Sequence, residues 1–482
     1  MSKPGPERYD AIVIGSGQAG SPLATAFARA GLKAALVERA HVGGTCVNVG
    51  CTPSKTMFAS ARVAYLARRA PEYGIRTGTV NVDLERVRQR TRAVVQRFRD
   101  KGTQNLKEAA GLALLFGHAR FRDARTVEVR LHDGAERILT APAIFIDTGS
   151  SPRRPDLPGI DRLPVLDSTS IMELTTVPEH LLVLGGGTVG VEFAQMFRRF
   201  GSRVSIVERG PQLLPQEDRD VAAAVAEILR QDGVDVFLES SALEARRNGN
   251  GRIALRLRFP HGERTLTGSH LLIAAGRTPN TEALDLAAAG VTVDDRGYIR
   301  VNERLETNVP GIYALGEVRG APPFTHFSYD DFRIIRTNLL ENGAATVEGK
   351  TLCYTVFIDP QLGRLGLTET EARKQRAPIR VAKLPFNRIA RAVEADEERG
   401  FLKVILDAGT GQILGAAVLG MEGGEMMAML QIAMMGRIAY PVLRDAIFAH
   451  PTLAEALNNV FVSLDSSEME AQPQAMQKEH FQ

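Results

Sequence analysis

The sequence YDAIVIGSGQAG at residues 9–20 decides the fold of the first part of the chain. Its apolar, β-branched first half is typical of a buried strand, and it runs directly into a G-x-G-x-x-G pattern at Gly15, Gly17 and Gly20. A second strand-like run ends at Glu38. Together these features predict a dinucleotide site, with the pyrophosphate at a helix N-terminus and Glu38 on a ribose hydroxyl.

The same unit recurs in the middle of the chain. A second glycine pattern at Gly185, Gly187 and Gly190 follows a strand-like run, and the next such run ends at Glu208. Two nucleotide sites imply two cofactors, or one cofactor and one co-substrate; the alternative is a structural duplicate that binds nothing. Glu208 favours the free ribose hydroxyl of NADH, whereas the neighbouring Arg209 leaves the 2′-phosphate of NADPH open.

A pair of cysteines stands in GGTCVNVGCTPSKT, residues 43–56. Cys46 and Cys51 are two of only three cysteines in 482 residues, so redox chemistry is a better reason for their spacing than structural bridging. The glycines predict irregular backbone between them, and Pro53 suits the first turn of a helix. Cys51 then lies at a helix N-terminus, near the charge of Lys55, where a thiolate is stabilised. The alternative is two small buried cysteines in a glycine-rich turn.

Composition excludes several other classes. Hydrophobic content of 44%, charged content of 24% and a net charge of +3 are ordinary for a globular protein and give no strong attraction to nucleic acid or membrane. No apolar run is long enough for a membrane span, and the N-terminus lacks an apolar signal core. We therefore expect a cytoplasmic protein, in which reducing conditions let the cysteine pair cycle.

The chain between and after the two glycine patterns shows further elements. We expect a helix over residues 82–108, a proline- and glycine-rich crossover at 144–159, and a similar exit at 271–280. Residues 307–318 predict a strand, and 324–335 a helix that returns the chain to the first domain.

The last third of the chain changes character. From about residue 351, alternating strand-like runs predict an antiparallel sheet with helices. Methionines crowd residues 421–435; thioether ligation of copper or mercury is one interpretation, and an apolar core or subunit interface is the favoured one. Cys353 is expected to be a buried thiol, and the polar residues 466–482 a disordered tail.

A histidine and a glutamate lie near the end, in FAHPTLAEALNNVF. Glu455 is spaced to hold one ring nitrogen of His450, which leaves the other for proton transfer. The alternative is a structural histidine.

Taken together, these residues resemble the class I, FAD-dependent pyridine nucleotide-disulfide oxidoreductases, which include dihydrolipoamide dehydrogenase, glutathione reductase and mercuric reductase. The resemblance covers residues 9–464 and rests on four motifs: GSGQAG, GGTCVNVGCTPSK, GGGTVGVEFA and AHPTLAEA. It is greatest to the mercuric reductase-like and copper reductase-like members.

The resemblance implies an α/β fold with two Rossmann-like domains and a C-terminal α+β dimerisation domain, assembled as a homodimer. The implied boundaries are 1–150 for FAD, completed by 281–350, then 151–280 for NAD(P) and 351–465 for the interface. The implied FAD contacts are Gly15, Gly17, Gly20, Glu38, Gly44, Thr45, Lys55, Gly149, Gly316 and Glu317. The implied NAD(P) contacts are Gly185, Gly187, Gly190, Glu208 and Gly276.

The resemblance also implies a mechanism. NAD(P)H reduces the flavin, which reduces a disulfide between Cys46 and Cys51; Cys51 faces the flavin, and Cys46 attacks the substrate or binds a metal ion with Cys51. Lys55 and Glu192 match an ion pair beside the flavin. In the family, the histidine that His450 matches acts as a base, is oriented by the residue that Glu455 matches, and reaches the disulfide of the other subunit.

Two departures from the family bear on cofactor and substrate. The second flavin motif of the family ends in Gly-Asp, whereas this chain has Gly316 and Glu317. Mercuric reductases carry a vicinal cysteine pair near the C-terminus, which this sequence lacks. We expect reduction of Hg(II), Cu(II) or a small disulfide; dihydrolipoamide dehydrogenase is the main rival enzyme, glutathione reduction is less favoured, and a flavin-bound redox sensor is the rival from another class.

Overall fold

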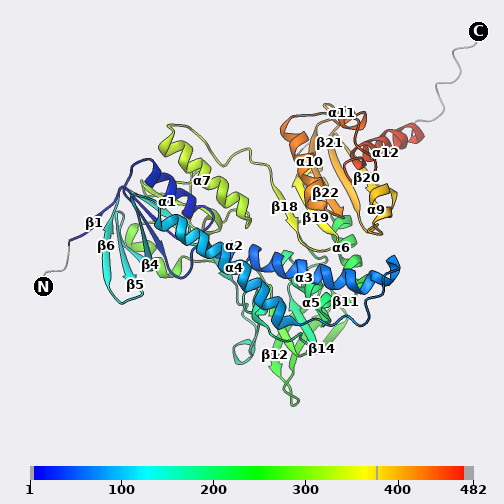
Figure 1. Ribbon diagram of the computed structural model, residues 1–482, viewed down its shortest axis with the longest axis horizontal. Coiled ribbons are helices and arrows are strands. Elements are labelled where there is room, and N and C mark those ends of the chain that lie inside the picture. Colours follow the sequence, from blue (N-terminus) through cyan, green and yellow to red (C-terminus); the bar gives the residue numbers. More distant parts are fainter. Residues whose placement is uncertain (1–4, 376–377, 472–482) are drawn as a thin grey trace, which may run out of the picture. The chain divides into compact units, whose positions relative to one another are not determined.

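The computed structural model describes residues 5–375 and 378–471 (Figure 1). The chain forms two compact units, each built from separate stretches of sequence. The first unit comprises Met1–Asp156, Pro164–Val177 and Leu272–Lys350, and the second comprises Leu157–Leu163, Pro178–Leu271 and Thr351–Gln482.

An eight-stranded sheet forms the centre of the first unit, in the order β1-β6-β5-β4-β3-β2-β7-β17. Its strands are β1 Glu7–Arg8, β2 Ala11–Ile14, β3 Ala34–Glu38, β4 Leu112–Asp123, β5 Thr126–Leu131, β6 Glu136–Thr140, β7 Ala143–Ile146 and β17 Ile312–Ala314. The strands β4, β3, β2, β7 and β17 pair in parallel. Every residue of β2 and β3 is buried, as expected of parallel strands covered on both faces.

Helices follow the strands of this sheet. They are α1 Gly20–Arg29, α2 Gly44–Asn48, α3 Cys51–Arg69, α4 Leu84–Lys107 and α7 Thr325–Leu340, with the short β8 Ser150–Pro152 and β16 Arg277–Pro279 paired beside them. The helix predicted over 82–108 is confirmed as α4, which begins after Asp83, whose carboxylate accepts a hydrogen bond from Arg86 N at 2.9 Å. The predicted strand and helix after residue 307 are confirmed as β17 and α7.

The second unit contains three sheets. The first, in the order β11-β10-β9-β15, belongs to the second glycine pattern, and the antiparallel β12-β13-β14 lies next in the sequence. These elements are β9 His180–Leu184, α5 Thr188–Phe200, β10 Arg203–Val207, α6 Arg219–Gln231, β11 Val234–Phe237, β12 Ser241–Arg247, β13 Ile253–Phe259, β14 Gly262–Gly268 and β15 His270–Ile273.

The third sheet of this unit is antiparallel, in the order β18-β19-β22-β21-β20. Its elements are β18 Cys353–Val356, β19 Gln361–Gly366, α8 Glu369–Gln375, β20 Ile379–Pro385, α9 Ala390–Glu394, β21 Phe401–Asp407, β22 Ile413–Gly420, α10 Gly423–Met435, α11 Tyr440–Arg444 and α12 Ala456–Ala471. The antiparallel sheet was predicted correctly, although β19 and β20 were not recognised. With its parallel sheets and this separate C-terminal part, the chain has the predicted α/β fold class.

The methionine-rich stretch forms α10. Met426 and Met427 are buried in the core of the C-terminal sheet, whereas Met435 is 76% exposed. This packing favours the core interpretation over thioether ligation. Cys353 is half-buried, with its Sγ 3.5 Å from the amide nitrogen of Gln431, so it is more accessible than predicted.

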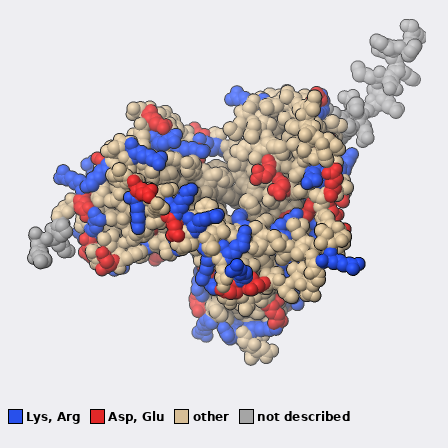
Figure 2. Space-filling model, in the orientation of Figure 1, with Lys and Arg blue, Asp and Glu red and all other residues tan. Residues whose placement is uncertain are grey.

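Helix α12 continues to Ala471, into the segment expected to be a disordered tail, and residues 472–482 lie outside the described residues. Among the described helices, none is both long and apolar enough to cross a membrane. Figure 2 shows Lys and Arg interspersed with Asp and Glu on the face in view, in keeping with the net charge of +3.

Candidate functional site

The first glycine pattern forms a tight turn between β2 and α1. Gly15 has φ +104°, and a Cβ there would lie 2.2 Å from the carbonyl oxygen of Asp147. A Cβ on Gly20 would lie 2.1 Å from the carbonyl oxygen of Gly15. Only glycine fits at either position, and the turn leads directly into the N-terminus of α1, the kind of helix end that binds anions.

The two acidic residues predicted to bind ribose occupy equivalent places. Glu38, at the end of β3, accepts hydrogen bonds through Oε2 from Ser16 N at 3.1 Å and Ser16 Oγ at 2.6 Å. Glu208, just after β10, accepts one through Oε2 from Gly186 N at 2.7 Å. Each carboxylate is thus fixed beside its own glycine turn, where a ribose would approach.

The two cysteines lie on either side of a break in the backbone. Cys46 is in α2 and Cys51 is the first residue of α3, as predicted, with the irregular Gly50 between the helices. A Cβ on Gly44 would lie 2.7 Å from Cα of Gly17, so α2 rests directly on the first glycine turn. The cysteine loop and the flavin motif therefore form one structure.

Both cysteines are thiols in this structure, Cys51 exposed and Cys46 half-buried. The Sγ of Cys51 lies 3.3 Å from Oγ1 of Thr325, at the start of α7. The hydrogen bond with Cys51 and burial raise the pKa of the Cys46 thiol, whereas Thr325 and Lys55 lower it. The first thiolate to form is shared between two sulfurs, which is the behaviour of a reactive dithiol.

A large cleft of about 1240 Å³ opens beside this loop within the first unit. Its lining includes Ser16 and Gly17 of the glycine turn, Gly43 and Val47 of the cysteine loop, and Tyr329 of α7. Its volume and the close-packed glycines at one end fit a dinucleotide such as FAD, whereas Glu38, Cys46 and Cys51 are not among the residues that line it.

The second flavin motif lies under the same turn. Gly316 has φ +68° and donates its N–H to Oδ2 of Asp331 at 2.7 Å. Oε2 of Glu317 accepts hydrogen bonds from Ser150 Oγ and, at 3.2 Å, from Arg277 Nε. The carboxylate of Glu317 is therefore held by protein groups, and its predicted contact with the flavin stays a prediction.

The other glycines and Thr45 have less defined surroundings. Gly149 and Gly276 adopt φ of +63° and +103°, conformations that favour glycine, at the two ends of the paired β8 and β16. Thr45 lies in α2, and Gly187 and Gly190 lie at the start of α5 as predicted. Gly185 has φ +117°, in the turn after β9.

His450 and Glu455 are brought together in the second unit. Nδ1 of His450 lies 2.9 Å from Oε2 of Glu455, and the histidine is exposed, with 66% of its side chain accessible. The carboxylate therefore holds one ring nitrogen, and the other is available for proton transfer.

The predicted pair of Lys55 and Glu192 spans the two units and stays a prediction. Lys55 lies on α3 of the first unit, whereas Glu192 is buried on α5 of the second. There, Oε1 of Glu192 accepts a hydrogen bond from Phe357 N at 2.8 Å.

Sequence reasoning missed three features of this site. Thr325 contacts Cys51, Asp147 contacts the glycine turn, and Arg277 binds Glu317. Each contact joins segments that are distant in the sequence. Only one of the three could have been suspected from the sequence: Asp147 is an acidic residue directly after the apolar run 143–146, which suggests a buried polar contact.

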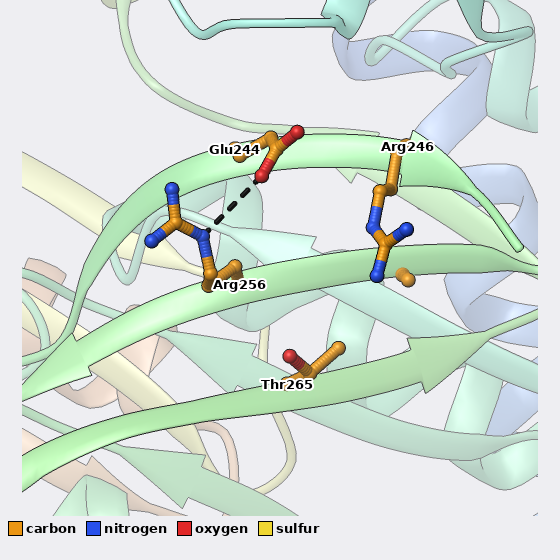
Figure 3. A pocket seen from close by; sticks show the side chains of 5 residues that line it. Glu244, Arg246, Arg256 and Thr265 are labelled. Carbon is orange, nitrogen blue, oxygen red and sulfur yellow. Dashed lines mark hydrogen bonds and ion pairs between the residues drawn. The ribbon is translucent and has the colours of Figure 1, made fainter.

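A second hollow, of about 200 Å³, lies on the sheet β12-β13-β14 of the second unit (Figure 3). Arg256 there forms ion pairs with Glu244 at 3.3 Å and Glu263 at 3.0 Å. None of the predicted site residues lines it, and the charge of Arg256 is compensated by these two carboxylates.

Two glycine-turn nucleotide motifs and a dithiol at a helix N-terminus define a nucleotide-dependent dithiol oxidoreductase. The sequence profile described as pyridine nucleotide-disulphide oxidoreductase matches residues 9–331, and that of the dimerisation domain of these proteins matches residues 352–461. The chain belongs to this family, whose cofactors are FAD and NAD(P)H.

Curated relatives match over nearly the whole chain. The probable pyridine nucleotide-disulfide oxidoreductase RclA of Escherichia coli is 39% identical, covering 94% of this chain and 99% of that protein. A mercuric reductase of Streptomyces lividans is 34% identical over 93% and 94% of the two chains, and a dihydrolipoyl dehydrogenase of Thermus scotoductus is 35% identical over 93% and 96%.

Solved structures agree with these relatives. The HOCl-induced flavoprotein disulfide reductase RclA of E. coli superimposes with a TM-score of 0.85 at 38% identity, covering 94% of this chain and 99% of that one. Its Cu(II) complex gives a TM-score of 0.86 at 37% identity, over 95% and 99%.

Proposed function

We propose that this protein is an NAD(P)H-dependent flavoprotein reductase that passes electrons through Cys46 and Cys51 to a soft metal ion, Hg(II) or Cu(II), or to a small disulfide. The observation that carries the proposal is the hydrogen-bonded thiol pair on the loop that lines the FAD-sized cleft. The oxidoreductase would act on metal ions or on sulfur groups, in a reducing compartment such as the cytosol.

The electron balance is simple. Bound FAD supplies the relay by which two electrons from NAD(P)H reach the Cys46–Cys51 disulfide, giving NAD(P)⁺ and, with a proton from solvent, two thiols. For a disulfide acceptor, the Cys46 thiolate attacks one sulfur of the acceptor, which forms a mixed disulfide and releases the first thiol. Cys51 then attacks Cys46, which restores the internal disulfide and releases the second thiol. For a metal acceptor, the paired thiolates bind the soft ion as a substrate, and the two electrons from one NAD(P)H reduce one Hg(II) to Hg(0) or two Cu(II) ions to Cu(I), with release of NAD(P)⁺ and one proton.

Other residues hold cofactors and protons. Glu38 and Glu208 would bind the ribose hydroxyls of FAD and of the nicotinamide nucleotide, and Glu208 favours NADH. We propose a homodimer formed through the C-terminal domain, in which His450 of the partner subunit, oriented by its Glu455, takes and returns the thiol proton. The Cu(II) complex of a relative at 37% identity supports the metal version.

Dihydrolipoamide dehydrogenase remains the second candidate, because the His450–Glu455 contact of 2.9 Å provides the proton acceptor that dithiol oxidation needs. The flavin-bound sensor is disfavoured by the same contact, since sensing requires no proton relay.

The deciding experiment is an anaerobic NADH titration followed by visible spectroscopy, with later additions of Hg(II), Cu(II), lipoamide and oxidised glutathione. A long-wavelength thiolate-to-flavin band that one acceptor discharges, with steady NADH consumption, supports the proposal and identifies the acceptor class. The proposal is refuted if NADH reduces the flavin without this band, or if none of the added acceptors removes the band. Rapid NAD⁺ reduction by dihydrolipoamide favours the second candidate.

A further inference from the structure

A buried carboxyl group lies directly beneath the flavin glycine turn. Asp147 follows β7, is only 7% exposed, and accepts a hydrogen bond through Oδ2 from Gly20 N at 2.7 Å. Gly20 is the first residue of α1, so the carboxyl group of Asp147 contacts the helix N-terminus at which the first glycine pattern predicts the FAD pyrophosphate.

Glycines of both flavin motifs pack closely against the side chain of Asp147. A Cβ on Gly17 would lie 2.7 Å from Oδ2 of Asp147, and a Cβ on Gly20 would lie 2.9 Å from it. A Cβ on Gly316 would lie 3.2 Å from Oδ1. The carboxyl group of Asp147 therefore packs against both flavin motifs. A change in its charge alters the electrostatic potential at both of them.

The charges that act on Asp147 belong to Asp331 on α7 and to Glu38 at the end of β3. Asp331 in turn pairs with Arg319 at 2.7 Å, and Glu317 of the second flavin motif pairs with Arg277.

The two arginines of this region, Arg319 and Arg277, thus form ion pairs with carboxylates other than that of Asp147. Burial raises the pKa of Asp147 well above its ordinary value; the hydrogen bonds from the N–H groups of Gly20 and Ala19 lower it, and the charges of Asp331 and Glu38 raise it further.

We propose that Asp147 is a flavin-retention residue, which holds the Gly20 turn in the binding conformation while neutral and expels FAD when ionised. The ionised carboxylate would cancel the positive potential of the α1 terminus and repel the pyrophosphate across the turn. Ionisation releases one proton to solvent, so FAD binding at alkaline pH takes one proton up. The inference concerns flavin binding and is independent of the electron acceptor.

The test is FAD dissociation from the flavin-loaded protein, followed by the rise in flavin fluorescence between about pH 6 and pH 10, where exposed carboxyl groups no longer titrate. In the native protein, the Kd for FAD should rise by up to about tenfold per pH unit above the pKa of Asp147. Asp147→Asn keeps the shape and the acceptor oxygen but cannot ionise, so its Kd should lose this rise. An equal rise in both proteins would overturn the proposal.

Two controls separate this effect from general loss of structure. Asp133→Asn changes an exposed acid in the turn between β5 and β6 and should keep the native pH profile. Calorimetry of FAD binding to the native protein in buffers of different ionisation enthalpy should show uptake of one proton at alkaline pH. This measurement needs no variant, and absence of uptake would overturn the proposal even if Asp147→Asn failed to fold.

Discussion

Thr325 and Cys51 lie side by side, with Oγ1 and Sγ 3.3 Å apart, although 274 positions separate them in the sequence. Cys51 is the first residue of α3 and Thr325 the first residue of α7, so two helix N-termini meet at one thiol. Both helix dipoles and the hydroxyl group favour negative charge at this point.

Replacing the hydroxyl should slow the chemistry of the dithiol. The hydrogen bond from Thr325 lowers the pKa of Cys46, so Thr325→Val should raise that pKa, because the thiolate loses a hydrogen-bond donor. Alkylation of Cys46 in the reduced protein, followed by mass spectrometry, should be about tenfold slower at neutral pH and recover at higher pH. Thr325→Ser should behave as the native protein; an unchanged profile for Thr325→Val would contradict the assignment.

Removing one thiol should separate the two half-reactions. Cys46→Ser should abolish reduction of disulfide acceptors while NADH still reduces the bound flavin, because Cys51, which we propose to face the flavin, and both nucleotide motifs remain. Stopped-flow absorbance measures the flavin step, and acceptor-dependent NADH oxidation measures the whole cycle. Cys353→Ser is the matched control, since Cys353 lies in β18 of the second unit, and it should retain turnover. Full turnover in Cys46→Ser would refute the dithiol mechanism.

The histidine should matter most where a thiol proton moves. His450→Ala should lower the rate of disulfide reduction by about 10²- to 10⁴-fold, the usual contribution of a general base, and metal reduction by less. Glu455→Gln, which keeps an acceptor oxygen for Nδ1 but removes the charge, should cause a smaller loss of the same kind, because the ring of His450 keeps its orientation. Equal losses for disulfide and metal acceptors would argue against this role.

A buried ion cluster should support the stability of the second unit. Nζ of Lys403, in β21, lies 3.2 Å from Asp218, 2.9 Å from Asp220 and 2.8 Å from Glu369, and its side chain is 2% exposed. Lys403→Met would leave these carboxylates without their shared cation and should cost about 3–5 kcal/mol of unfolding free energy. Lys383→Met, which removes an exposed partner of Asp220, should cost less than about 1 kcal/mol in the same denaturation experiment.

The same cluster sets a direction for the pH dependence. Burial tends to raise the pKa of Glu369, but hydrogen bonds from Lys403 and Arg373 lower it overall. A carboxyl group with a lowered folded-state pKa contributes stability that is present above its ordinary pKa, about 4.3, and lost as the pH falls through the folded value. As the pH falls, the free energy of unfolding should therefore decrease more steeply in the native protein than in the Lys403→Met variant. Equal pH dependence of the unfolding free energy in the two proteins would contradict the role of the cluster.

Local sequence predicted what local geometry determines. The turn at Gly15, the carboxylate of Glu38 and the position of Cys51 at a helix start all follow from residues within one strand–turn–helix segment. The contacts of Thr325 and Asp147 could not be predicted in this way. They depend on the strand order that places β7 beside β2 and β17 beside β7, which no short stretch of sequence encodes.

The place of β17 at the edge of the first sheet has a consequence for biogenesis. Residues 312–314 pair with β7, but they are synthesised after all of 178–271, which belong to the second unit. Until they leave the ribosome, β7 is an open sheet edge, a known hazard for misassociation. Gly316 and Thr325 follow still later, so flavin loading and protection of the dithiol are late events in the making of this protein.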